Sequence, residues 1–193
     1  QRLGALGLFD PSAMPVRSLS PEDLNPLERQ RIREAIRRYG GDMTLLPLAD
    51  EELDGALGLV TNAEGVRRPT VSGLLLMGRE AVIRQHLPAH EVAFQVLEGT
   101  DVRVNEFFRK PLLQSFEEVD LLFKAQVVEQ EIQVGLFRVP IPNFDRRAFR
   151  EGFINALVHR DYARLGAVHV RLDDDGLTIT NPGGFIEGVT LQN

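Results

Sequence analysis

The stretch REGFINALVHRDY, residues 150–162, decides how the second half of this chain is interpreted. At about 100° per residue, Phe149, Phe153 and Ala156 fall within one narrow sector of a helix. The spacing therefore predicts a helix with one apolar face that packs against a core. The question is why the same helix also carries regularly spaced polar residues on another side.

Glu151 and Asn155 are those polar residues, and they are one helical turn apart. A carboxylate can orient or deprotonate a water molecule, and an amide oxygen is a hard ligand suited to Mg²⁺. The alternative is an ordinary solvated helix face, which is the more frequent reason for such a pair. The spacing alone does not separate the two interpretations.

The segments on either side of the helix add to the pattern. Asn143 or Asp145 is expected to cap its first turn, and the residues from Gly166 to Gly184 predict a hairpin. Within it, Asp175-Gly176 is a two-residue turn signal. The hairpin ends in Asn-Pro-Gly-Gly, where glycines allow the backbone to approach a ligand closely.

These segments together, REGFINALVHRDY and GAVHVRLDDDGLTITNPGGFIEGVT, closely resemble the C-terminal ATP-binding domain of a bacterial family. Its members are described as RecG-related ATP-dependent DNA helicases or as transcriptional regulators, and the domain is related to the GHKL ATPases. The upstream stretches PTVSGLLLMGRE and VLEGTD resemble the part that precedes this domain. The resemblance covers residues from about 19 to 193.

The resemblance implies a role for each polar residue. Glu151 matches the acidic residue that orients or activates water, and Asn155 matches the asparagine that binds magnesium. Asn181 aligns with the aspartate that contacts the adenine amino group, in a box that includes the backbone at Gly183 and Gly184. The implied cofactors are ATP and Mg²⁺. A role for His159 near a phosphate pocket is a further expectation.

The sequence departs from the GHKL pattern in two respects. The adenine-contacting aspartate is replaced by Asn181, which offers a donor and an acceptor instead of a carboxylate. The later glycine-rich lid and the upstream Schlafen-like module, which is thought to bind nucleic acid, are not in this chain. We therefore expect a fragment, itself inactive as an ATPase, of a protein that meets DNA through a domain outside this sequence.

The rest of the chain is divided by composition. Residues 1–19 read as a linker, residues 20–85 as a helical region, and residues 86–193 as a partial GHKL-like domain. In the second part, Ser20 and Pro21 predict the start of a helix that Gly40-Gly41 ends. We expect an α+β fold, with a small helical N-terminal portion followed by a partial GHKL-like helix-over-sheet sandwich.

Further segments are assigned to regular structure with varying clarity. Residues 91–99 alternate as a strand that pairs with VRVNEF, residues 110–126 are helical, and residues 131–140 have strand character. Residues 67–78 are too short an apolar run to distinguish helix from strand.

Three other patterns have competing interpretations. His159-Arg160-Asp161 resembles a kinase catalytic loop, but Gly166 stands where that loop needs an asparagine, so Arg160 and Asp161 are expected to end the helix, with Tyr162 packing nearby. His86 and His90 lack a third metal ligand.

The first helix carries five arginines, which either contact DNA or pair with the interleaved Glu28 and Glu34: Arg29, Arg31, Arg33, Arg37 and Arg38.

Composition limits the function classes. The net charge of −6 argues against nucleic-acid binding through the chain's own surface, and the absence of cysteine excludes disulfides and thiol catalysis. No apolar run reaches the ~20 residues of a membrane span, and no secretory signal is visible, so we expect a cytoplasmic location. No P-loop occurs in the sequence, which gives the helicase assignment the least support.

The leading expectation is an ATP- and Mg²⁺-binding regulatory domain of a transcriptional regulator or RecG-related protein, with Glu151 as the base if hydrolysis occurs. The alternative is a degenerate, non-catalytic scaffold that mediates homodimerisation of a DNA-binding regulator. Intact Glu151 and Asn155 favour the first, and the replacement at Asn181 favours the second.

Overall fold

The computed structural model describes residues 10–134, 136–162 and 164–183, and it is α+β, as expected. The chain forms two compact units. The first comprises residues up to Pro88 together with Lys110–Leu113, and the second comprises Ala89–Arg109 together with the residues from Gln114 onward. Within the described ranges, no helix is both long and apolar enough to cross a membrane.

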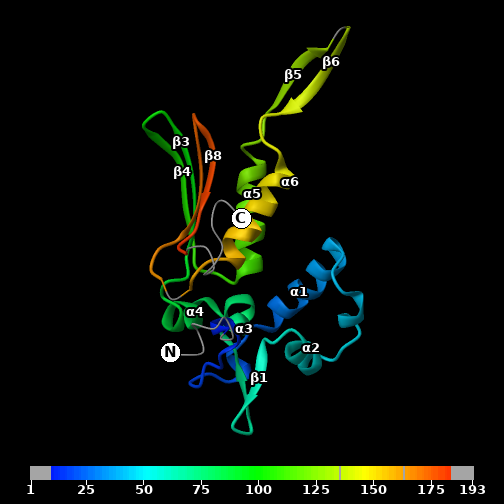
Figure 1. Ribbon diagram of the computed structural model, residues 1–193, viewed down its shortest axis with the longest axis vertical. Coiled ribbons are helices and arrows are strands. Elements are labelled where there is room, and N and C mark those ends of the chain that lie inside the picture. Colours follow the sequence, from blue (N-terminus) through cyan, green and yellow to red (C-terminus); the bar gives the residue numbers. More distant parts are fainter. Residues whose placement is uncertain (1–9, 135, 163, 184–193) are drawn as a thin grey trace, which may run out of the picture. The chain divides into compact units, whose positions relative to one another are not determined.

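The first unit is mainly helical and has one small hairpin (Figure 1). Its β1 and β2 pair antiparallel, with Val60 opposite Pro69. Its elements, in chain order, are η2 Pro11–Ala13, η3 Pro21–Asp23, α1 Pro26–Tyr39, η4 Met43–Leu45, α2 Asp50–Ala56, β1 Val60–Ala63, β2 Val66–Pro69, α3 Val71–Met77 and α4 Glu80–His86.

The described part of the expected linker, residues 10–19, packs into this unit. The Val16 N–H donates to the Pro69 carbonyl across 2.8 Å, and the Val71 N–H donates to the Met14 carbonyl across 3.0 Å. Leu19 is buried in a cluster with Leu74 and Ile83. Residues 10–19 therefore belong to the fold, because their apolar side chains meet partners far along the sequence.

The first long helix begins later than the sequence predicts. Ser20 and Asp23 form a reciprocal capping box, but it caps only the turn η3. Helix α1 starts at Pro26, where the Asn25 side chain accepts from the Leu27 N–H across 3.1 Å. Gly40 ends the helix in the left-handed conformation, as predicted.

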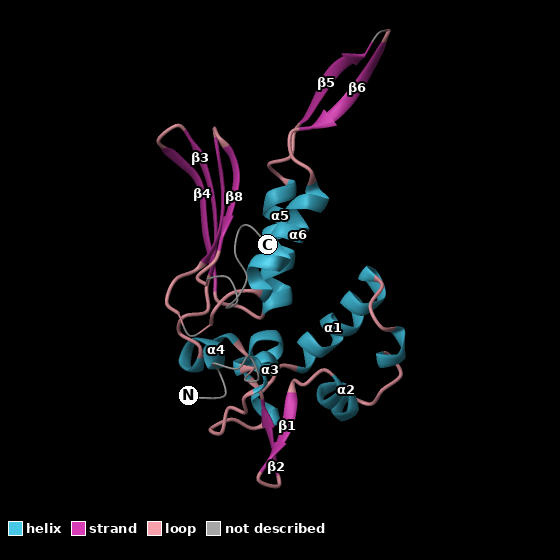
Figure 2. Cartoon of the chain, viewed as in Figure 1, coloured by secondary structure: helices cyan, strands magenta, loops and turns pink. Residues whose placement is uncertain are grey.

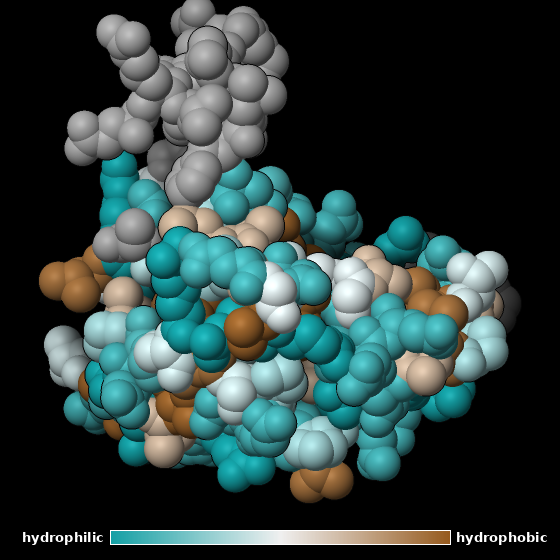
Figure 3. Space-filling view, turned by 90° about the horizontal axis from the view of Figure 1, so that it is seen from below, coloured by the Kyte–Doolittle hydropathy of each residue, from teal (hydrophilic) through white to brown (hydrophobic). Residues whose placement is uncertain are grey.

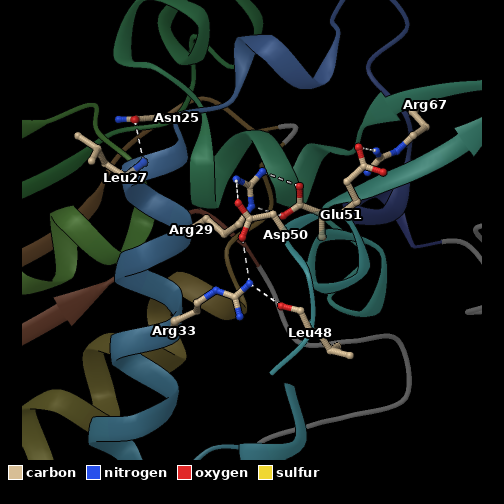
Figure 4. Close-up of polar contacts among 9 residues, drawn as sticks. Asn25, Leu27, Arg29, Arg33, Leu48, Asp50, Glu51 and Arg67 are labelled. Atoms are coloured by element: carbon tan, nitrogen blue, oxygen red, sulfur yellow. Dashed lines mark hydrogen bonds and ion pairs between the residues drawn. The ribbon is translucent and has the colours of Figure 1, made fainter. Parts of the chain in front are cut away.

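Two arginines of α1, Arg29 and Arg33, make contacts within their own unit (Figure 4). Arg29 and Arg33 both contact Asp50, and Arg33 also donates to the Leu48 carbonyl across 2.8 Å. Arg31 pairs with Glu28 within the helix, as one interpretation predicted. These guanidinium groups are committed to intramolecular contacts, which disfavours the DNA-contact interpretation for this face of α1.

Helix α3 lies directly on the backbone that leads into β1. The Thr70 side chain caps the helix and also donates to the Gly58 carbonyl across 2.7 Å. A Cβ atom at Gly73 would lie 2.0 Å from the Leu59 carbonyl oxygen, so only glycine permits this contact. The stretch 67–78, which the sequence left unresolved, is therefore a strand (β2) followed by a helix (α3).

The second unit contains a mixed four-stranded sheet in the order β4-β3-β7-β8. Strands β3 and β7 are parallel, with Val92 beside Val168, and the other neighbours are antiparallel. Its elements are β3 Val92–Glu98, β4 Asp101–Phe108, α5 Leu112–Lys124 from Gln114 onward, β5 Glu129–Val134, β6 Phe137–Pro142, α6 Arg146–Val158, β7 Val168–Asp173 and β8 Gly176–Thr180.

Stacked aromatic rings join α5 to α6 in this unit. Phe123 and Phe149 lie 3.8 Å apart between ring centroids, and Phe116 and Phe153 lie 5.8 Å apart. All four side chains are buried, and so are alternate residues of the sheet such as Phe94 and Val170. The predicted apolar face of the helix at 150–162 is thus confirmed as a core face.

Two hairpins of the second unit differ in detail from the sequence prediction. The segment 131–140, expected as one strand, belongs to the two-stranded hairpin β5–β6, which extends from the ends of α5 and α6 (Figure 2). The tight turn between β7 and β8 consists of Asp174 and Asp175, because Asp173 already pairs with Gly176. Asp174 also accepts from the Gly99 N–H across 2.9 Å, which fixes the turn to the β3–β4 connection.

Exposed apolar side chains are mostly scattered. On the face drawn in Figure 3, hydrophobic residues lie singly among hydrophilic ones, as on most protein surfaces. In and beside the β5–β6 hairpin, however, the side chains that the structure describes include three exposed apolar ones within a short segment: Val128, Leu136 and Ile141.

Candidate functional site

Helix α6 positions the two polar residues that the sequence singled out. The Asp145 side chain accepts from the N–H groups of Arg147 and Ala148 and thereby caps the helix, which settles the choice between Asn143 and Asp145. Because Phe149 and Phe153 face the core, Glu151 and Asn155 are on the exposed side. The local sequence therefore determines which way both side chains face.

A groove of about 400 Å³ lies along this exposed side. Glu151 and Asn155 both line it. The lining combines three guanidinium groups, one carboxylate, one amide and one apolar side chain: Arg146, Arg147, Arg150, Glu151, Ile154 and Asn155.

Helix α5 holds two of the three arginines in place. Arg146 makes a two-pronged contact with Asp120, with Nη2 to Oδ2 at 2.5 Å and Nε to Oδ1 at 3.2 Å. The Arg150 guanidinium lies 5.6 Å from the centre of the Phe116 ring. Asp120 and Phe116 are one turn apart on α5, as Arg146 and Arg150 are on α6. The two contacts therefore fix neighbouring cations along one side of the groove.

The turn after β8 meets the C-terminal end of α6. The Asp161 N–H donates to the Pro182 carbonyl across 2.8 Å. The Asn181 amide donates to the His159 carbonyl across 3.2 Å. A Cβ atom at Gly183 would lie 3.2 Å from that same carbonyl oxygen, so glycine allows the turn to approach the helix end.

Arg160 stabilises the same corner from inside. It is 5% exposed, and it donates to the carbonyls of Ala89 and Gly166, to the latter across 2.6 Å. Its guanidinium also lies 4.6 Å from the ring centre of Tyr162. Arg160 follows the end of α6, as the sequence predicted, and its side chain turns into the unit.

Burial shifts the pKa values of Arg160 and Tyr162. Burial lowers the pKa of Arg160, although the nearby Tyr162 and Asp161 oppose that shift. Burial raises the pKa of Tyr162 to about 12, against the favourable charge of Arg160. The neutral Tyr162 hydroxyl donates to the Leu157 carbonyl across 2.9 Å, in the last turn of α6. These are structural roles, and the kinase-loop interpretation gains no support.

The predicted site residues thus fall into two groups on one helix. Glu151 and Asn155 share the groove, whereas His159, Asn181 and Gly183 meet at the end of α6. Asn155 lies one turn from His159, about 6 Å along the helix axis. Gly184 lies outside the described residues.

The arginines at the N-terminal half of α6 were missed by the sequence analysis. Arg146 and Arg150 are four residues apart, and Arg147 and Glu151 repeat that spacing on the adjacent face. This repeat was a usable signal, since residues at that spacing lie side by side on a helix.

The described residues contain no group of three or more His, Asp or Glu side chains that would hold a metal ion unaided. His90, considered with His86 in the sequence, is 1% exposed in the core of the second unit. A divalent cation at Asn155 would accordingly be held mainly by water and by oxygen atoms of a bound ligand.

Comparison with known proteins supports the fold. Residues 8–93 match a family described as a domain of unknown function (DUF8451). The chain is similar to the crystal structure of the DIP2311 protein from Corynebacterium diphtheriae, at 24% identity and a TM-score of 0.71. That likeness covers 96% of this chain and 35% of DIP2311, so the chain spans about a third of the other's length. No curated protein matches the sequence.

Proposed function

We propose that the second unit binds an adenine nucleotide with Mg²⁺ along helix α6 and serves as a regulatory domain. The supporting observation is that Glu151 and Asn155 line one groove, and that Asn155 lies one helical turn from His159, whose carbonyl accepts from Asn181. Asn155 would supply an amide oxygen to the cation, and Glu151 would orient water. The identity of the ligand and the roles of the two residues come from the family resemblance of the sequence.

The wider setting follows from that resemblance. The protein would act in the cytoplasm as part of a bacterial transcriptional regulator or RecG-related protein. Contact with DNA would be made by a domain outside this chain, since Arg29, Arg31 and Arg33 of α1 are engaged within the first unit. Hydrolysis, if the whole protein carries it out, would use Glu151 as the base.

Calorimetric titration with Mg·ATP tests the proposal. Asn155→Ala should weaken binding roughly tenfold to a hundredfold, because the cation loses one of its few protein ligands, and binding should fall when Mg²⁺ is removed. Asn62→Ala, at an exposed asparagine in β1 of the other unit, is the matched control and should bind as the wild type does. Equal affinity in all three proteins would refute the role of Asn155.

The second candidate is a non-catalytic scaffold that forms a homodimer. Two observations favour it: Asn181 uses its amide within the fold, and Leu136 at the tip of the β5–β6 hairpin is 96% exposed. Sedimentation analysis of the wild type and Leu136→Asp distinguishes the candidates. A dimer that Leu136→Asp dissociates, in a protein that binds no nucleotide, would support the scaffold.

A further inference from the structure

We infer that Arg147 and Arg150 form a phosphate-binding end of the α6 groove, and that it takes the phosphate chain of a nucleotide. This deepens the proposed function and rests on it for the identity of the ligand's other end. The inference assigns the phosphates of the ligand to the N-terminal half of α6.

The charge distribution along the helix is the first reason. From its C-terminal end, the groove lining runs from Asn155 through Glu151 to Arg150, Arg147 and Arg146. Cationic side chains are thus confined to one half of the groove. The N-terminal half of a helix also carries the positive end of its dipole, which adds to the attraction for an anion.

Preorganisation is the second reason. Phe116 fixes the guanidinium of Arg150, and Asp120 fixes the neighbouring Arg146. A guanidinium that is already held in place loses less conformational entropy when it binds a phosphate, so its contacts favour binding more strongly. Arg146 holds Asp120 by two contacts and borders the same end of the groove.

Arg147 is the more accessible of the two proposed ligands. It is exposed at the start of α6, beside Glu151 on the next turn. Planar guanidinium groups on successive turns suit a chain of phosphates, because each offers paired N–H donors to the oxygens. Glu151 lies between Arg147 and Asn155 along the helix, where a carboxylate would meet the cation that accompanies the phosphates.

Inorganic tripolyphosphate tests this end of the site without adenine, in titrations of the 193-residue chain at low ionic strength. We expect the wild type to bind it, and Arg147→Ala and Arg150→Met each to weaken binding about tenfold. Met keeps an apolar chain over Phe116 and so guards against loss of packing. Arg103→Ala, at an exposed arginine of the same unit, is the control and should leave affinity unchanged.

Parallel titrations with Mg·ATP and Mg·AMP separate this inference from the proposed function. The expected result is that the arginine variants weaken ATP binding more than AMP binding. ATP binding that is equal in the wild type and both arginine variants overturns the phosphate end and leaves the proposed function standing. In another outcome, tripolyphosphate binds and needs both arginines, whereas ATP binds no more tightly than tripolyphosphate and its affinity is unchanged by Asn155→Ala. That outcome supports the phosphate end and refutes the proposed function.

Two further outcomes count against the inference. If neither tripolyphosphate nor Mg·ATP binds the wild type, both the inference and the proposed function fail. If duplex DNA binds more tightly than tripolyphosphate and depends on the same arginines, the ligand is a nucleic-acid backbone, and the nucleotide assignment is overturned.

Discussion

The side-chain amide of Asn181 donates a hydrogen bond across 3.2 Å to the backbone carbonyl oxygen of His159. This bond joins the turn after β8 to the last residues of α6. By the sequence resemblance, Asn181 aligns with the base-contacting aspartate of GHKL ATPases, and here its amide also makes a bond within the fold. An aspartate could not do this, because an ionised carboxylate has no hydrogen to donate.

Replacing Asn181 with aspartate should therefore destabilise the second unit. Asn181→Asp places a carboxylate oxygen against the His159 carbonyl, and we expect a loss of about 1 kcal/mol in the free energy of unfolding. Thermal unfolding of the wild type and the variant measures it. Thr178→Asp, which adds the same charge at an exposed position on β8, controls for net charge. Equal melting temperatures for Asn181→Asp and the wild type would contradict the bond's role.

Two glycines of the first unit should respond oppositely to alanine. At Gly73 the new Cβ would lie 2.0 Å from the Leu59 carbonyl oxygen, so α3 must shift, and we expect a loss of about 1–3 kcal/mol. Gly55 in α2 has no atom within 4 Å of its Cβ position. Because alanine favours a helix interior, Gly55→Ala should gain about 0.5–1 kcal/mol. Urea unfolding measures both, and a harmless Gly73→Ala would show that the close contact is not maintained.

The pKa of Tyr162 can be measured directly, since the chain contains two tyrosines, Tyr39 and Tyr162. In Tyr39→Phe, the ultraviolet absorbance of the phenolate reports Tyr162 alone. Burial should place its pKa at about 12, above the ordinary 10.0. A midpoint near the ordinary value in the folded protein would mean that the ring is not buried.

The same shift predicts how stability depends on alkaline pH. The folded pKa of Tyr162 is raised, so the neutral phenol stabilises the fold fully below pH 10.0, and that contribution is lost as the pH rises toward about 12. Tyr162→Phe removes this dependence, although it also removes the hydrogen bond to Leu157. The measurement is the difference in unfolding free energy between neutral and alkaline pH for the two proteins.

The two carboxylates that meet Arg29 should differ in importance. Asp54 accepts from Arg29 Nε and Nη2, both across 2.7 Å, and its side chain is 3% exposed. Asp54→Ala should cost about 3–5 kcal/mol, because it leaves a buried cation without its main partner. Asp50 is 63% exposed, so Asp50→Ala should cost less than about 1 kcal/mol.

A double variant gives the control for this pair. Arg29→Leu with Asp54→Leu removes both charges together, and it should be more stable than Asp54→Ala alone. Chemical unfolding of the three variants supplies the comparison. Similar losses for Asp50→Ala and Asp54→Ala would show that burial of the Arg29–Asp54 pair does not set its strength.

Local sequence signals were sufficient for several elements. The spacing of Phe149, Phe153 and Ala156 predicted α6 and its buried face, and Gly40 predicted the end of α1. The reason is that helical periodicity, glycine at a left-handed position and strand alternation act over a few residues. For the same reason the exposure of Glu151 and Asn155 followed from the helix alone.

Equivalent local signals could not be ranked without the tertiary structure. Ser20-Pro21 and Asn25-Pro26 both have the residue types that begin a helix. Helix α1 starts at the second pair, because Leu24, which lies between the two pairs, is buried in the core and not in a helix. The linker expected over residues 1–19 could not be tested locally either, since Leu19 finds its buried partners, Leu74 and Ile83, 55 and 64 residues away.

The groove itself was decided by tertiary contacts. The sequence determined which side chains α6 turns away from the core, because that depends only on where its apolar residues lie. It did not determine that Phe116 and Asp120 would fix Arg150 and Arg146, or that Asn181 would reach His159. Those contacts join residues 22 or more positions apart, and only the packing of α5, α6 and the sheet brings them within bonding distance.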